Sequence, residues 1–209
     1  PPIPSYGWYG CGYYYDPQKV ILDEEATYVI DKDGNAVLAK YIGTGSEFVA
    51  RETVDGIPVT KIGRYAFYQK SNLKTYWIPN EIQVIGDFAF DGCNGLALLL
   101  ENTRLPASLG SGWNSNCSYY LGAQVFTEGD FRFVKDKDDR VDILTYLGDG
   151  ENAVVPAQAG GHPLTRIPNY GFYGSNVKRV VLPEGITALG YNAFGECRQL
   201  REIQLPQSL

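Results

Sequence analysis

The sequence lacks methionine entirely and has a single histidine, His162, and four cysteines among 209 residues. No CxxC pair occurs, so the chain does not offer the cysteine and histidine ligands that a zinc site needs. Phosphate-loop and dinucleotide-binding fingerprints are absent as well, because its glycines recur at regular intervals and open no long helix. We therefore expect neither a metal nor a cofactor.

Long apolar runs and clusters of basic residues are also missing. The longest apolar stretch, Leu96–Leu100, suits a buried strand and is far shorter than the 18 or so residues of a membrane span. Formal charge is -6, with Lys and Arg scattered singly. This composition excludes an electrostatic footprint for nucleic acid or for an anionic membrane.

The start of the sequence, Pro1–Pro4, has no initiating methionine, so we interpret it as a processed or truncated end. Removal of an upstream secretion signal would leave such an end, and so would artificial shortening. The 16 tyrosines and three tryptophans favour an extracellular, binding-type surface, because these side chains give large contact area at small entropic cost. Tyrosines at repeat positions have a structural explanation instead.

What the sequence does contain is one long segment written twice, 105 residues apart. Three of the matching pairs are Asp31–Asp33 with Asp136–Asp138, Tyr41–Gly43 with Tyr146–Gly148, and Pro58–Ile62 with Pro163–Ile167. After Tyr68 and Tyr173 the offset falls to 104, as in Cys93 and Cys197. Self-similarity of this length predicts stacked supersecondary units in a solenoid.

A shorter unit recurs inside each copy, about 23 residues long, as from Ile62 to Ile85. Its spaced apolar residues predict a short strand that points alternate side chains inward, and its Ala–Phe pair predicts an aromatic plug on the opposite side. We expect Gly63, Gly86 and Gly190 to permit a tight bend. Stacked coils would align their strands in one parallel sheet.

The unit resembles the bacterial leucine-rich repeats of the BspA type. The pattern V-T-x-I-G-x-x-A-F stands here as Val59–Phe67, and C-x-x-L-x-x-I-x-L-P stands as Cys197–Pro206. A hairpin and a D-G-x-P-V-T lead-in are present as well, at Asp31–Asn35 and Asp55–Thr60. Pro168 replaces the usual Gly, and Gly171 the usual Ala.

The resemblance implies a leucine-rich repeat solenoid, a right-handed β/α superhelix that is mostly β, with turns or short helices opposite the sheet and β-hairpins leading into each repeat block. The predicted parts are an aromatic, Gly-rich arm or cap at 1–26, a first module at 27–130 and a second module at 131–209. The first holds coils at about 62–84 and 85–108 and a degenerate coil at 109–130; the second holds coils at about 167–188 and 189–209.

Cysteines and acidic turns each leave an alternative open. Cys93, Cys117 and Cys197 share one repeat column, which predicts buried thiols bonded to loop backbone; the alternative is a disulfide between Cys93 and Cys117 in adjacent coils, roughly 5 Å apart. The Asp-Lys-Asp segments at 31–33 and 136–138 read as hairpin turns, with a calcium loop as the alternative.

The candidate ligand-binding surface is the row of strand residues that point outward. Strand phase assigns to it Thr75, Trp77, Leu98, Leu100, Arg179, Val181, Glu202 and Gln204. Trp77 is the strongest candidate for a ligand contact, since aromatic residues dominate interface hot spots. The alternative is that the N-terminal arm or the linker covers this row.

Three functional hypotheses remain. The first is a non-catalytic binding module for a protein or glycan; the resemblance implies a bacterial cell-surface protein, secreted or tethered, that adheres to host extracellular matrix or to another cell. The second is a structural spacer that self-associates. The third is a hydrolase, which would need His162 as its base, although His162 stands in a Gly-rich loop where the first copy has Ile57.

Overall fold

The structure is a computed structural model that describes residues 19–209, so the aromatic segment Tyr6–Tyr15 and Cys11 lie outside the described part. Residues 19–209 form 21 strands joined by turns and contain no helix. Turns alone therefore occupy the face for which the sequence left short helices open. In this part of the chain nothing helical is long and apolar enough to cross a membrane.

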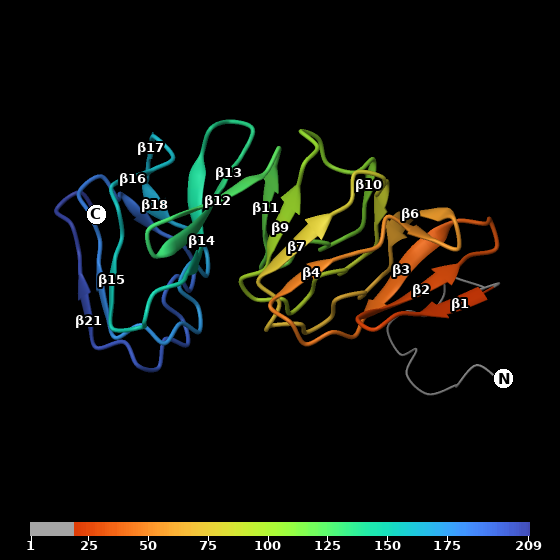
Figure 1. Cartoon of the computed structure of the whole chain (residues 1–209), viewed down its shortest axis with the longest axis horizontal. Helices are drawn as coiled ribbons and strands as arrows, with labels where there is room; N and C mark the ends of the chain where they lie inside the picture. Colours follow the sequence, from red (N-terminus) through yellow and green to blue (C-terminus); the bar gives the residue numbers. More distant parts are fainter. Residues whose placement is uncertain (1–18) are drawn as a thin grey trace. The chain divides into compact units, whose positions relative to one another are not determined.

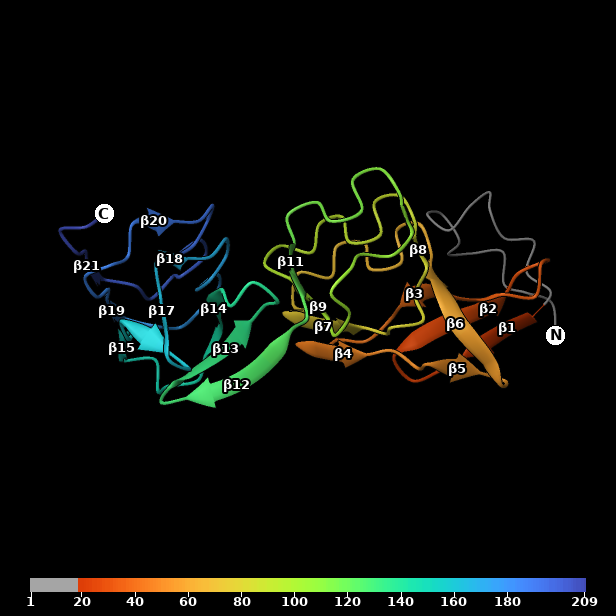
Figure 2. The ribbon, with the colours of Figure 1, turned by 90° about the horizontal axis from the view of Figure 1, so that it is seen from above.

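The described residues divide into two compact units, one that ends at Tyr119 and one at Tyr120–Leu209. This division lies earlier than the predicted boundary between residues 130 and 131. The reason is β12 (Gln124–Glu128), which pairs in antiparallel fashion with β13 (Phe131–Lys135) and so belongs to the second hairpin group (Figure 2). Residues 19–22, assigned by sequence to the arm, form β1 (Lys19–Leu22) and pair with β2 (Ala26–Ile30).

In unit 1 an antiparallel hairpin leads into two parallel ladders (Figure 1). The first ladder begins at β3 (Ala36–Tyr41), which is antiparallel to β2, and continues in parallel through β6 (Ile57–Ile62), β8 (Val84–Ile85) and β10 (Ser108–Leu109). The second ladder runs in parallel through β4 (Glu47–Val49), β7 (Thr75–Ile78) and β9 (Ala97–Leu100). The short strand β5 (Thr53–Val54) pairs with β6, and β11 (Ser118–Leu121) crosses the division between the units.

Unit 2 repeats this plan. Its lead-in sheet is β12, β13 and β14 (Val141–Tyr146), followed by the hairpin of β16 (Gln158–Ala159) and β17 (His162–Pro163). One parallel ladder is β18 (Arg166–Ile167) with β20 (Ala188–Leu189). The other is β15 (Asn152–Val154), β19 (Arg179–Val181) and β21 (Glu202–Gln204). The fold is therefore a mostly β leucine-rich repeat solenoid with hairpins leading into each repeat block, as the sequence predicts.

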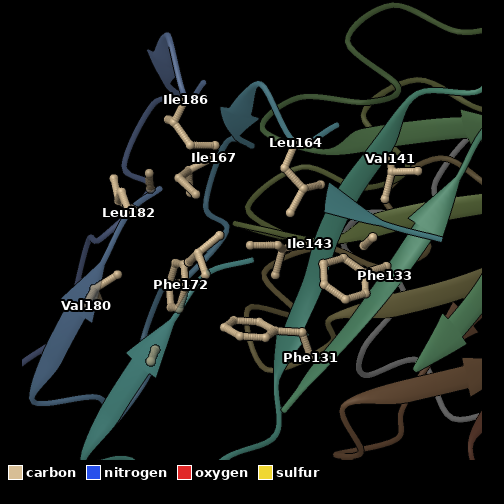
Figure 3. Packing of buried hydrophobic residues seen from close by; sticks show 14 of the residues in the cluster. Phe131, Phe133, Val141, Ile143, Leu164, Ile167, Phe172, Val180, Leu182 and Ile186 are labelled. Atoms are coloured by element: carbon tan, nitrogen blue, oxygen red, sulfur yellow. The ribbon is translucent and has the colours of Figure 1, made fainter. Parts of the chain in front are cut away.

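The aromatic plugs of successive coils lie on one another inside each unit. The ring centroids of Phe67 and Phe90 are 4.9 Å apart in unit 1, and those of Phe172 and Phe194 are 5.2 Å apart and nearly parallel in unit 2. Figure 3 shows Phe172 in the buried cluster of unit 2 that also contains Val180 and Ile167. Equivalent side chains of neighbouring coils thus form the core, which is what makes each coil depend on the next.

The repeated glycine has a different role from the bend that the sequence suggested. Gly86 has an ordinary negative φ, but a Cβ at this position would lie 2.6 Å from the backbone nitrogen of Arg64 in the preceding coil. The same Cβ at Gly190 would lie 2.3 Å from the nitrogen of Asn169. Glycine is needed here because two coils approach closely, and not because the chain turns sharply.

Pro168 shows why this rule is relaxed in the first coil of a unit. Its counterpart Gly63 meets only looser neighbours, with the nearest backbone atom 3.3 Å from a built Cβ, so a side chain is better tolerated there. Gly171 compensates for the bulk of Pro168, because a Cβ at position 171 would lie 2.9 Å from Ile167 and 3.1 Å from the Pro168 ring. The two departures from the repeat pattern are therefore coupled.

The cysteine column consists of free thiols. The Cys93 and Cys197 thiols donate to the carbonyl oxygens of Phe67 and Phe172 in the preceding coil, each at 2.9 Å. Cys117 makes a longer contact of 3.7 Å to Phe90. Burial raises the pKa of Cys93 to about 11, which keeps this sulfur a protonated donor. The prediction of backbone-bonded thiols is confirmed, and the alternative disulfide between Cys93 and Cys117 is wrong.

Candidate functional site

The acidic turns use their carboxylates to hold the backbone. In unit 1 the Asp31 carboxylate accepts hydrogen bonds from the amides of Asp33 and Asn35, at 3.0 and 2.8 Å. In unit 2 Asp136 accepts from the amides of Asp138 and Arg140, both at 3.0 Å. No group of three or more acidic, histidine or cysteine side chains is placed to bind a metal within residues 19–209. The geometry is that of a hairpin turn.

Asp31 is also the carboxylate of a partly buried ion pair with Lys61, at 2.9 Å. Burial raises the pKa of Asp31, but the hydrogen bonds from Lys61 and Asn35 outweigh this and hold the pKa below its usual value of 3.8. The unfolded chain therefore binds this proton more readily than the folded chain does. The stabilisation from Asp31 is present above pH 3.8 and is lost as the pH falls through the lower folded-state pKa.

We expect Asp31→Asn to reduce the stability of unit 1 at neutral pH and to flatten its decline below pH 3.8. Urea unfolding followed by tryptophan fluorescence measures this, because all three tryptophans precede residue 120. Asp33→Asn is the matched control, since Asp33 is exposed and lies 3.9 Å from its charged partner Lys32. Identical pH profiles for the two variants would contradict the assignment.

In unit 2 a larger ionic cluster takes the place of this pair, with buried carboxylates and partly exposed arginines. Asp142, which is fully buried, stands where unit 1 has Val37. Its two carboxylate oxygens accept from Arg166 Nε at 3.0 Å and Nη2 at 2.5 Å, and Tyr120 lies 3.2 Å away. Arg140 links Asp142 to Asp136, at 3.8 and 2.8 Å. All charges in this cluster are paired, so it fixes the lead-in hairpin onto the first coil.

His162 lies in strand β17 and not in the open loop that the sequence suggested. It pairs with Ala159 across the Gly160–Gly161 turn and is half-buried. The first copy has a hairpin at the same place, β5 with β6, in which Ile57 pairs with Val54. Both copies therefore have a hairpin at this position.

The outward row of unit 1 follows from the strand register. Tyr76 and Phe48 pack in the core, so their neighbours Thr75, Trp77 and Val49 have the opposite phase. Trp77 is half-buried, and Thr75 is buried. Register then pairs Trp77 with Leu99 and not with Leu98.

Leu98 and Leu100 are corrections to the predicted row. Both are buried and pair with the inward residues Tyr76 and Ile78. The reason is one missing residue: Leu73 to Leu96 is a step of 23, but Tyr76 to Leu98 is a step of 22. Because side chains alternate between faces, a shift of one residue exchanges the two faces. Leu99, not Leu98, has the outward phase, and it is also buried.

In unit 2 the predicted residues all have the outward phase. Arg179 and Val181 are half-buried, whereas Glu202 and Gln204 are exposed. The Arg179 guanidinium lies 3.1 Å from a Glu202 oxygen and donates to Gln204 Oε1, also at 3.1 Å. A polar ladder therefore crosses β19 and β21 on this face.

Strands β4 and β15 add residues that the sequence reading missed. Val49 and Val154 occupy the same place in the two copies, next to Trp77 and Val181, and they are 69% and 63% exposed. A signal is present in the sequence, because Val49 and Val154 match at the offset of 105. The repeat pattern alone does not mark these segments, because they precede the first recognisable coil.

Six copies of the BspA type leucine rich repeat region match the chain, over residues 57–118 and 164–209, which is more than half of it. The chain belongs to the BspA-type leucine-rich repeat family. Repeat proteins of this family typically mediate protein interactions. The matched segments contain most strands of the parallel ladders, whereas β3, β4, β15 and most of the hairpins that lead into each BspA-type block lie outside them.

Several solved structures are similar to this chain. A leucine rich cell surface protein from Faecalibacterium prausnitzii is 15% identical, with 91% of this chain and 77% of that chain covered and a TM-score of 0.38. The T. pallidum leucine rich repeat protein is 21% identical, with 90% and 84% covered and a TM-score of 0.41. The pneumococcal vaccine antigen PcpA is 17% identical, with 91% and 71% covered and a TM-score of 0.35. No curated protein matches.

Proposed function

We propose that this chain is a non-catalytic binding module that uses the outward row of both units to hold a protein ligand. The observation that carries this proposal is the repeated pair of exposed valines, Val49 and Val154, at the same place in the two copies. An outward valine on a strand gains nothing from the fold while it is exposed, and it gains on burial against a partner. Each unit therefore offers a ligand one such contact.

The two rows differ in chemistry, which bears on the kind of ligand. The row in unit 1 combines Val49 with the half-buried Trp77, an apolar pair suited to an anchor side chain. The row in unit 2 combines Val154 with Arg179 and Glu202, whose charges are paired with each other. Apolar centres with a polar margin are typical of protein interfaces. A protein ligand is therefore favoured over a glycan.

The site of action that we propose is the bacterial cell surface, where the chain would adhere to host extracellular matrix or to another cell. Support comes from the family and from the Faecalibacterium prausnitzii relative, which is described as a cell surface protein. The tyrosine-rich composition agrees with an extracellular binding surface.

The double variant Val49→Glu with Val154→Glu tests the surface. Both side chains are largely exposed, so the variant should fold normally while losing binding to a matrix protein by about tenfold or more, because it places unpaired charge in an apolar contact. Biolayer interferometry against a panel of matrix proteins measures this. Leu22→Glu is the matched control, since Leu22 is 78% exposed and lies outside the row. Equal binding by the double variant and the control would refute the proposal.

A further inference from the structure

A second feature lies at the ends of the strands, away from the outward row. The loop that joins β9 to β10, which we call a descending loop, is longer than its counterparts in the other coils. Leu100 and Leu109 are nine positions apart. Ile78 and Ile85 are seven positions apart, as are Leu182 and Leu189. In the regular coils a Pro follows the last inward residue directly, as at Pro79 and Pro183. Here Pro106 comes six residues after Leu100.

This longer loop and the loop of the preceding coil line a pocket of about 260 Å³ in unit 1 that is open to solvent. Its apolar walls come from Ile78, Ile82 and Leu100, which are buried, and from Leu105 with Pro79 and Pro106. Its polar groups are Asn80, Gln83, Asn102 and Arg104. Residues of the longer loop therefore line this pocket, and the shorter loops of the other coils have no counterpart to them.

The polar side chains of the pocket keep some hydrogen-bonding capacity and one positive charge for a ligand. The Asn102 side-chain amide donates to the Asn80 carbonyl oxygen at 3.3 Å, and the Asn80 amide donates to Glu101 at 3.1 Å. The Glu101 carboxylate beside the pocket thus already has a partner. Arg104 is exposed and, within residues 19–209, forms no ion pair.

We infer that this pocket binds one aliphatic residue of an extended peptide, with a carboxylate next to it on Arg104. The volume suits one side chain and its flanking groups, being below the 300 Å³ or so at which sites for larger ligands begin. An arginine pairs with a carboxylate through two parallel hydrogen bonds, and the asparagine and glutamine side chains can bond the peptide backbone. No aromatic ring lines the pocket to stack on a sugar.

The simplest probe is N-acetyl-L-leucine, which joins an aliphatic side chain, an acetamide and a carboxylate. We expect it to shift the amide NMR signals of residues 79–83 and 101–107 in the full chain, with a Kd on the order of 1 mM for so small a ligand. N-acetyl-L-leucinamide, which lacks the charge, should bind about tenfold more weakly. N-acetylglycine, which lacks the side chain, should bind more weakly as well.

The variant Arg104→Gln should weaken the binding of N-acetyl-L-leucine about tenfold, and it should remove the preference for the acid over the amide. Arg201→Gln is the matched control, since Arg201 is exposed and lies in unit 2. Three results would overturn the inference: no shifts at these loops at 20 mM or so of ligand, equal binding of acid and amide, or tighter binding of N-acetylneuraminic acid, which would identify an acidic-sugar site. The outward-row variants do not alter this pocket, so the two proposals fail independently.

Discussion

Replacing Gly86 by alanine should lower the stability of unit 1 by about 3 kcal/mol, at the upper end of the usual range for overpacking. A Cβ there would lie 2.6 Å from the Arg64 nitrogen and 2.9 Å from the Gly63 carbonyl carbon, and backbone atoms cannot rotate away as a flexible side chain can. The coils must separate instead, which weakens the contacts on both sides of the second coil.

The measurement is urea unfolding followed by tryptophan fluorescence, which reports on unit 1 because residues 120–209 contain no tryptophan. Gly45→Ala is the matched control, since its built Cβ has no neighbour nearer than 3.4 Å and its φ is not positive. Gly63→Ala should fall between the two, with its nearest atom at 3.3 Å. If Gly86→Ala and Gly45→Ala unfold at the same urea concentration, the close approach of two coils is not the reason for glycine at this repeat position.

The second large effect is expected in unit 2, where Asp142→Val should lower the free energy of unfolding by about 3 kcal/mol. Asp142 is fully buried and accepts hydrogen bonds from Arg166 Nε and Nη2, so its loss leaves the Arg166 guanidinium without this carboxylate beside the core, whereas Arg140 keeps Asp136. Arg140 and Arg166 remain partly exposed, which places the effect at the lower end of that for a broken buried pair.

Native-state hydrogen exchange at the amides of β14 and β18 measures this effect. The double variant Asp142→Val with Arg166→Leu should recover part of the loss, because it replaces the charged pair by an apolar contact of the kind that Val37 makes in unit 1. Glu196→Gln is a surface control, since its partner Arg198 is largely exposed and the change should have little effect. A double variant less stable than Asp142→Val alone would contradict this account.

The repeat made most of this fold predictable, because equivalent residues must occupy equivalent environments once coils stack. The aromatic plugs Phe67 and Phe90 and the thiol of Cys93 lie where the pattern places them. The hairpin turn at Asp31 was predictable for a local reason, since its carboxylate caps amides only two and four residues away.

What the pattern could not give was strand phase and inter-coil distance. Leu98 and Leu100 were assigned to the wrong face because a single lost residue is invisible in an apolar run, where every register looks equally hydrophobic. The need for Gly86 was recognised but attributed to a bend, because the clash lies with Arg64, which is 22 residues away in sequence. Likewise, no local signal connects Pro168 to the missing methyl group of Gly171.

The long loop between Leu100 and Leu109, which are nine positions apart, has a practical implication for engineering. Although it is two residues longer than its counterparts, β10 still pairs with β8 in the regular register, Ser108 with Val84 and Leu109 with Ile85. Extra length on this side is absorbed without disturbing the next rung of the ladder. Descending loops are thus the natural positions at which to graft foreign peptides for display, whereas one added residue within a strand would turn its core face outward.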